Sequence, residues 1–119
     1  MDTSLSGYAA RQLNRALRLD FNHPVTAYLV KAQFSVCCCL AQVYHHVSAR
    51  PDGWLQDGHR IRTSDIYRVD QWPEFWSFRT QRGSHYVVVT FAVPGGKHSL
   101  DQMLAILTRG VHPSARGYQ

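Results

Sequence analysis

The sequence predicts an α+β fold: one domain over residues 1–119 with two N-terminal helices, an antiparallel sheet of about four strands and one C-terminal helix. Three observations support this prediction. Apolar residues recur at three- and four-residue spacing through the first 48 positions, which is the period of a helix. Turn signals then separate short β-rich runs, beginning with the pair Asp57-Gly58. Helical spacing returns near the C-terminal end, so helices precede and follow one block of strands.

The first expected helix follows a serine cap, either Ser4 or Ser6. Its apolar positions share one face, and three arginines lie about a turn apart along it. The run "DFNHP" is expected to end the helix. The apolar positions are Leu5, Ala9, Leu13, Ala16 and Leu17, and the arginines are Arg11, Arg15 and Arg18.

The second expected helix covers about residues 24–48. Asn22 or His23 would cap it, and Pro24 would take its first position, where a missing N–H costs nothing. The run "RPDG" would end it. Its expected core positions are Val25, Leu29, Ala32, Val36, Leu40, Val43 and Val47.

The rest of the chain favours strands. One strand is expected over about residues 59–69, the irregular run "DQWPEF" follows, and "WSFRT" and "HYVVVTFAV" form a hairpin around the turn "QRGS". The last run is apolar on both faces, which places it centrally in the sheet. Ser99 and Gln102 match a capping box for a final helix to about residue 108, closed by Gly110.

Composition indicates a globular protein outside the membrane. Hydrophobic residues make up 45% of the chain and charged residues 18%, as in ordinary folded domains. The N-terminal segment lacks the apolar region of a secretion signal, and no apolar run reaches the ~20 residues that span a bilayer. Three cysteines cannot form a fully paired disulfide framework. We therefore expect a soluble protein of a reducing cytoplasm with no membrane partner.

The run "CCCLAQVYHH" (37–46) gathers thiols and imidazoles. On the expected helix, each cysteine–histidine pair on one face is seven residues apart, or about 10 Å along the axis, which is too far to share a zinc ion. We therefore expect the three thiols to be buried as small apolar groups, and we predict no metal and no cofactor. A metal site completed by His85 or His98 is the alternative.

Catalytic patterns are weak in this chain. Glu74 is the sole glutamate, the seven aspartates fall mostly at expected caps and turns, and no phosphate-binding glycine loop occurs. We expect a binding protein rather than an enzyme. A ribonuclease-like site that combines His45, His46, His59 or His85 with an arginine stays open as the alternative.

Arginines supply the candidate binding surface. The formal net charge is +5, and eleven arginines stand against two lysines. Strand alternation puts Arg60, Arg62 and Arg68 on one face, and Arg79 and Arg82 belong to the next strand and its turn. If these strands pair, their arginines form one basic patch for phosphates or an acidic protein, which the arginines of the first helix extend. The alternative is a solvated sheet face.

Trp72 and Phe75 are candidate partner-binding residues beside that patch. They lie in an expected loop, where large apolar side chains are harder to bury, and tryptophan and arginine often anchor protein interfaces. The alternative is that both side chains cover the core.

The runs "DGHRIRTSDIYRVD" and "WSFRTQRGSHYVV" resemble a pattern in small phage- and prophage-encoded proteins of unknown function. It covers about a quarter of the chain and brings no catalytic residue. The resemblance implies a small single-domain protein of a mobile element, some of which inhibit host defence systems such as CRISPR–Cas. The familiar inhibitors are mostly acidic, so the basic charge argues against a DNA-mimic mechanism. The matching positions are Ile61, Thr63, Ser64, Ile66, Phe78, Thr80, Ser84, Tyr86 and Val88.

Two functions follow from these expectations. The first is a non-enzymatic phage or mobile-element protein that binds and inhibits a bacterial host complex, including a ribonucleoprotein. The second is a small basic protein that contacts nucleic-acid phosphates through the arginine patch. The oligomeric state stays open.

Overall fold

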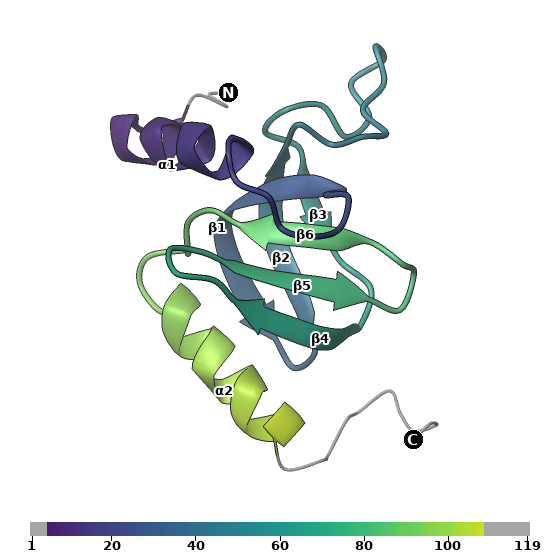
Figure 1. Ribbon diagram of the computed structural model, residues 1–119. Helices are drawn as coiled ribbons and strands as arrows, with labels where there is room; N and C mark the ends of the chain where they lie inside the picture. Colours follow the sequence, from purple (N-terminus) through teal and green to yellow (C-terminus); the bar gives the residue numbers. More distant parts are fainter. Residues whose placement is uncertain (1–4, 109–119) are drawn as a thin grey trace.

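The computed structural model describes residues 5–108, with helices at both ends of a six-stranded mixed sheet (Figure 1). The expected fold class was wrong in three respects. One helix, not two, precedes the sheet. The sheet has more strands than predicted, and one of its pairings is parallel. The elements are α1 (Gly7–Leu17), β1 (Ala27–Ser35), β2 (Cys38–Tyr44), β3 (Arg60–Arg62), β4 (Ile66–Gln71), β5 (Trp76–Thr80), β6 (His85–Val88) and α2 (Gly96–Thr108).

The expected second helix is in fact the antiparallel pair β1 and β2. A β-bulge in β1 explains the error: Leu29 faces the interior, the chain gains an extra residue around Lys31, and interior positions resume at Ala32. The step from Leu29 to Ala32 is three residues, which imitates a helix and hides the alternation of a strand. β-branched and aromatic residues throughout this segment favour the strand.

Val36 and Val47, which were expected in the core of the second helix, are exposed. Val36 occupies the tight turn between β1 and β2 with φ of 55° and is 62% exposed. Val47, also assigned to the helical core stripe, is 73% exposed. A β-branched residue with positive φ is strained, because its branched side chain crowds the backbone.

The strand order is β3-β2-β1-β6-β5-β4, and the sheet curls back on itself. Phe34 in β1 and Phe78 in β5 are separated by β6 in the ladder, yet their rings pack 5.6 Å apart across the interior. The chain between β3 and β4 joins the two ends of the sheet. The Ile66 N–H donates to the Cys37 carbonyl at 2.7 Å, while Ile66 itself pairs with Thr80 of β5.

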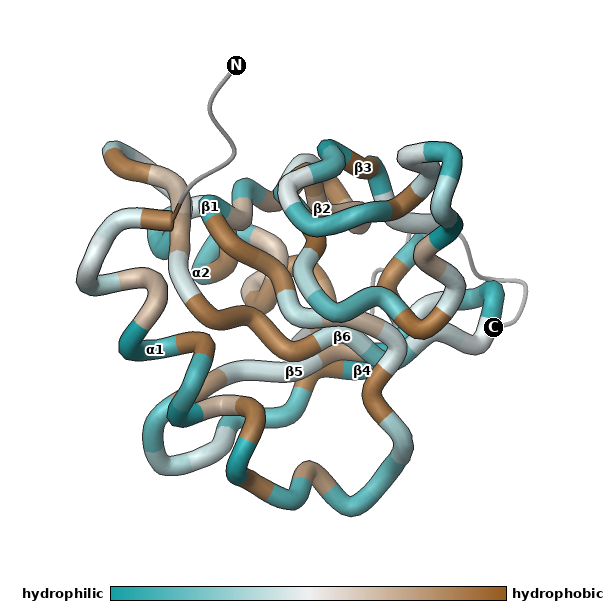
Figure 2. The backbone as a smooth tube through the Cα atoms, turned by 90° about the horizontal axis from the view of Figure 1, so that it is seen from above, coloured by the Kyte–Doolittle hydropathy of each residue, from teal (hydrophilic) through white to brown (hydrophobic). Residues whose placement is uncertain are grey.

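Two hydrophobic clusters lie on the two faces of this sheet. The interior cluster includes Leu29 and Phe78 and receives Leu100 and Met103 from α2, which covers one side of the curl. The outer cluster packs α1 against the alternate residues of β1 and β6 (Val30, Val87). Figure 2 shows hydrophobic stretches along β1 in the middle of the molecule. The central strands are therefore buried on both sides.

The first helix agrees with its sequence prediction. The Ser6 side chain caps α1 by accepting a hydrogen bond from the Ala9 N–H, and Ala9, Leu13 and Ala16 are buried. The hairpin of β5 and β6 is confirmed as well. Its second strand is central, as expected, although it pairs in parallel with β1.

Other boundaries differ from the prediction. The expected strand 59–69 is divided into β3 and β4, and Asp57-Gly58 does not form a hairpin turn but belongs to a long loop, 45–59. The final helix starts at Gly96, and Ser99 lies within its first turn, where its hydroxyl accepts a hydrogen bond from the Phe34 N–H. Gly110, its expected terminator, lies outside the described residues. No helix within residues 5–108 has the length and apolarity needed to cross a membrane.

One pair of substitutions tests this strand assignment. Leu29→Ala should lower the free energy of unfolding by about 2–5 kcal/mol, because Leu29 is fully buried. Val36→Asn should raise it by about 1 kcal/mol, because asparagine tolerates a left-handed backbone. Urea unfolding of both variants measures the difference. Equal destabilisation would contradict the assignment, since the rejected helix places both residues in its core.

Candidate functional site

Three cations on the outer face of β1, β2 and β3 form a surface that we call the cationic wall: Lys31, Arg60 and Arg62. Arg60 pairs across the sheet with Gln42, and Arg62 pairs with Leu40, so the two arginines project from the same face of β3. All three cationic residues are exposed. None of them forms an ion pair with an acidic group in residues 5–108.

The bulge of β1 places Lys31 in this wall. Lys31 has φ of 59°, a left-handed conformation that is uncommon for lysine. Its N–H donates to the Thr90 hydroxyl at 3.0 Å, and the Ala32 N–H donates to the Thr90 carbonyl at 3.0 Å. Bulges often redirect a side chain beside a functional site, and strained residues cluster there.

An open groove of about 1130 Å³ adjoins the cationic wall. The start of α1, Lys31 and Arg60 of the wall, residues 74–76 and residues 88–93 form its sides, and amide side chains lie among them. Two apolar residues on its sides are largely exposed, Tyr8 at 60% and Val93 at 93%. The lining includes Tyr8, Gln12, Lys31, Gln33, Gln42, Arg60, Glu74, Thr90, Phe91 and Val93.

The charge of the groove is positive. Glu74 is the sole glutamate of the chain, and it forms an ion pair with Arg15 of α1. Its charge is therefore balanced by a residue outside the wall, and Lys31 and Arg60 face the groove without an acidic partner in the described residues. An acidic or phosphate-bearing ligand is the complementary partner for such a surface.

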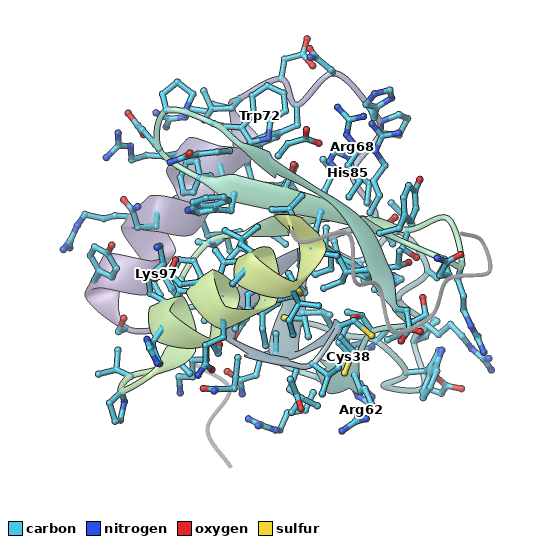
Figure 3. All side chains as sticks on the ribbon, turned by 90° about the horizontal axis from the view of Figure 1, so that it is seen from below. Cys38, Arg62, Arg68, Trp72, His85 and Lys97 are labelled. Atoms are coloured by element: carbon cyan, nitrogen blue, oxygen red, sulfur yellow. The ribbon has the colours of Figure 1, made fainter. Side chains whose placement is uncertain are left out.

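The predicted arginine patch is divided by the sheet topology. β3 pairs with β2 and β4 pairs with β5, so Arg60 and Arg62 share no strand register with Arg68. Figure 3 shows Arg62 in the lower part of the view and Arg68 in the upper part. Arg68 pairs with Asp70 on its own strand at 3.1 Å, and Arg82 is exposed in the β5–β6 turn.

The remaining arginines of the prediction lie on or next to α1. Arg11 and Arg18 are exposed, and Arg15 binds Glu74. Arg15 therefore attaches α1 to the segment before β5 and contributes no free charge to a basic surface.

Trp72 and Phe75 belong to the outer hydrophobic cluster. The Trp72 indole N–H donates to the Ser77 hydroxyl at 2.8 Å, and its ring packs edge-on against Phe21 at 5.3 Å. Phe75 is 2% exposed. We therefore leave Phe75 out of any contact surface, and Trp72 is half-buried beneath the end of α1.

The sequence did not lead us to expect that Trp54 is exposed. This side chain is 52% exposed in the loop 45–59, which projects away from the sheet in Figure 1. Internal bonds order the loop: the Arg50 N–H donates to the Trp54 carbonyl, and the Trp54 N–H donates to Asp52. Two Asp-Gly pairs within "PDGWLQDG" were the available signal, because two turns so close together leave no room for a strand between them.

The three thiols are buried, as expected, although they lie on β2 and the turn before it rather than on a helix. Burial raises the pKa of Cys37 to about 11, with a further contribution from Asp65, and burial also raises the pKa of Cys39. Residues 5–108 contain no cluster of three side chains suited to holding a metal ion. Raised pKa values oppose formation of the reactive thiolate.

His85 lies buried on the outer face of β6. Its Nδ1 lies 3.2 Å from the Pro24 carbonyl, and its neighbour in the β5 register is Arg79. Burial lowers the pKa of His85, and the neighbouring Arg79 and His23 lower it further. His85 therefore favours its neutral form in the folded protein.

Comparisons with known protein families, with curated proteins and with solved structures find no match to this chain.

The thiol environment predicts slow modification. At about pH 8 a thiol with a pKa of about 11 is thiolate in roughly one molecule in a thousand, so Cys37 and Cys39 should resist an aromatic disulfide reagent. We expect at most one thiol per native chain to react promptly, and all three to react in urea, as measured by release of the chromophore. Prompt reaction of two or three thiols in the native protein would contradict this.

His85 predicts a pH-dependent stability. Its folded pKa lies below the ordinary value of about 6.5, so the unfolded chain binds more protons when the pH falls. The stabilisation is complete above about pH 6.5 and is lost as the pH drops through the folded pKa. Urea midpoints should therefore fall between about pH 7.5 and 5.5, and His85→Gln should flatten this dependence. An unchanged slope in His85→Gln would refute the assignment.

Proposed function

We propose that this chain is a non-enzymatic binding protein that docks an acidic segment of a larger bacterial protein complex in the groove beside the cationic wall. The supporting observation is the set of exposed cations, Lys31, Arg60 and Arg62, that have no acidic partner in residues 5–108. Unpaired charges at an open groove keep their full attraction for a partner, whereas paired ones do not.

The chemistry of the groove favours a polypeptide. Arginine forms paired hydrogen bonds with carboxylates, and Gln33 and Gln42 can donate to and accept from a peptide backbone. Exposed Tyr8 and Val93 on the sides of the groove offer apolar contacts that a phosphate backbone would not use. An acidic protein segment that also carries apolar side chains meets all of these groups.

The loop 45–59 supplies a second contact surface in this proposal. Trp54 is exposed on a loop that its own hydrogen bonds hold, so a partner would pay little ordering entropy to bind it. Tryptophan is among the residues that contribute most to protein interfaces.

The resemblance to phage- and prophage-encoded proteins suggests the consequence of docking. In this proposal the partner is a host complex of the bacterial cytoplasm, such as a CRISPR–Cas ribonucleoprotein, and occupation of an acidic surface blocks its activity. The chain itself needs no cofactor for this role.

Nucleic-acid binding is the second candidate, and the same unpaired cations favour it. The two candidates differ in their response to salt. Binding through Z phosphates falls with salt at a log–log slope of roughly −0.9Z, whereas a protein interface keeps the part of its affinity that comes from the apolar contacts of Trp54 and the groove, which salt does not screen.

The test compares two triple variants in affinity capture from bacterial lysate. Lys31→Ala/Arg60→Ala/Arg62→Ala should weaken partner capture by about tenfold or more, because charged hydrogen bonds are lost. Arg11→Ala/Arg18→Ala/Arg82→Ala changes the net charge equally at other exposed sites and should retain capture. Both variants should unfold within about 0.5 kcal/mol per site of the parent chain.

Nuclease treatment separates the two candidates. A discrete protein partner that survives nuclease, and is lost only from the wall variant, supports the docking proposal. Recovery of mixed nucleic acid that nuclease abolishes would support the second candidate instead. Equal capture by both variants would refute a role for the cationic wall.

A further inference from the structure

A second cluster of basic side chains lies toward the ends of β5 and β6 opposite to Trp76 and Val88, which line the groove. It consists of His23, Arg79 and His85, none of which lines the groove. Arg79 stands between Arg68 of β4 and His85 of β6 in the strand register, so basic side chains from three strands share one row on the outer face.

The turn after α1 brings His23 to this row. The Asn22 N–H donates to the Asp20 carboxylate at 2.8 Å, and Asn22 adopts φ of 70°, which asparagine tolerates well. The chain then passes Pro24, whose carbonyl contacts His85. His23 Nε2 consequently lies 3.3 Å from an Arg79 guanidinium nitrogen, and the two imidazole rings meet edge-on at 6.1 Å.

Arg79 is incompletely satisfied. Its Nε is buried and has no hydrogen-bond partner, and no carboxylate pairs with its guanidinium among the described residues. Leaving such a donor unpaired costs free energy, and a charged donor costs more than a neutral one. The adjacent Arg68 differs, because Asp70 neutralises it at 3.1 Å.

The charges around Arg79 come from three elements. β4 contributes the paired Arg68 and Asp70, β6 contributes His85, and the segment before β1 contributes His23. The sole carboxylate in this set is held by Arg68, so the potential at Arg79 is positive. The lowered pKa of His85, to which Arg79 and His23 both contribute after burial, agrees with that sign.

We propose that Arg79 and His23 bind a tetrahedral oxyanion of the phosphate class. A guanidinium donates in one plane, and the His23 ring approaches from a different element, so a ligand needs oxygens in several directions. A tetrahedral phosphate offers them, whereas a carboxylate offers two oxygens in one plane. The anion replaces the present Arg79–His23 contact and neutralises the row, with His85 behind it.

Inorganic phosphate is the first probe. NMR titration of the intact protein should show saturable shifts of the His23 and His85 ring signals with phosphate, at constant ionic strength, and no saturation with chloride. The anion should also raise the pKa of His85, because a bound negative charge favours the protonated ring.

Two variants examine the geometry. Arg79→Lys keeps the charge but removes the planar donor, and should weaken phosphate binding by about tenfold or more. His23→Gln changes an exposed residue and should leave the fold intact, so it measures the loss of phosphate binding even if the Arg79 variant folds poorly. Arg82→Lys, in the nearby turn, is the matched control and should bind as the parent does.

A 5′-phosphorylated dinucleotide distinguishes the source of the phosphate. Binding at least as tight as inorganic phosphate, with the same dependence on Arg79, assigns the site to a nucleic-acid phosphate. Binding of inorganic phosphate alone assigns it to the free anion. Shifts that chloride reproduces, or that survive both Arg79→Lys and His23→Gln, would overturn the proposal.

Discussion

The structure depends on one backbone connection, the passage of the chain from β3 to β4. The Thr63 N–H donates to the Cys39 carbonyl and the Ile66 N–H donates to the Cys37 carbonyl, so this passage stays bound to β2. The same residue, Ile66, also pairs with Thr80 of β5. The same short segment therefore belongs to both ends of the sheet and holds it in a curl. Ile66 is fully buried at this junction.

The curl determines where charge can gather. In a flat sheet, the arginines of β3 and β4 would lie at the two opposite edges of one plane. Here the outer faces of the two halves point in different directions, so Arg60 lines the groove with Arg62 on the same face of β3, while Arg79 lies beside His23. α1 covers the outer face between them through Val30 and Val87. The curl of the sheet therefore produces two separate cationic surfaces.

Local sequence rules predicted the parts of this fold whose contacts are local. The cap at Ser6 and the apolar face of α1 depend on spacing within one helix, and the β5–β6 hairpin depends on one short turn. The error at β1 has a long-range cause. The bulge at Lys31 is held by Thr90, a partner 59 residues away, and no sequence feature between residues 24 and 48 indicates the bulge. Without that partner, the step from Leu29 to Ala32 is the step of a helix.

The candidate sites follow the same division. Sequence alternation identified Arg60, Arg62 and Arg79 as exposed or partly exposed cations, yet pairing of charges depends on folding. Arg15 meets Glu74, also 59 residues away, and Arg68 meets Asp70 on its own strand, so a count of arginines overstates the free positive charge. Lys31 contributes to the cationic wall because of the bulge, which the sequence concealed.

Whether a cation is paired with a carboxylate says more about its availability to a partner than the net charge of the chain does. A surface arginine with a carboxylate partner adds little to stability. It is also less available to a ligand, because its hydrogen bonds are already made. An exposed cation without a carboxylate partner is solvated at no great cost, and by itself proves nothing. Lys31 and Arg60 differ because they share one groove with exposed apolar groups, and Arg79 differs because its Nε is buried without a partner. The exposed Lys31 and Arg60 stay hydrated and available to a partner, whereas the buried Arg79 Nε has neither access to water nor a protein acceptor among the described residues, so the two places differ in how their positive charge is satisfied.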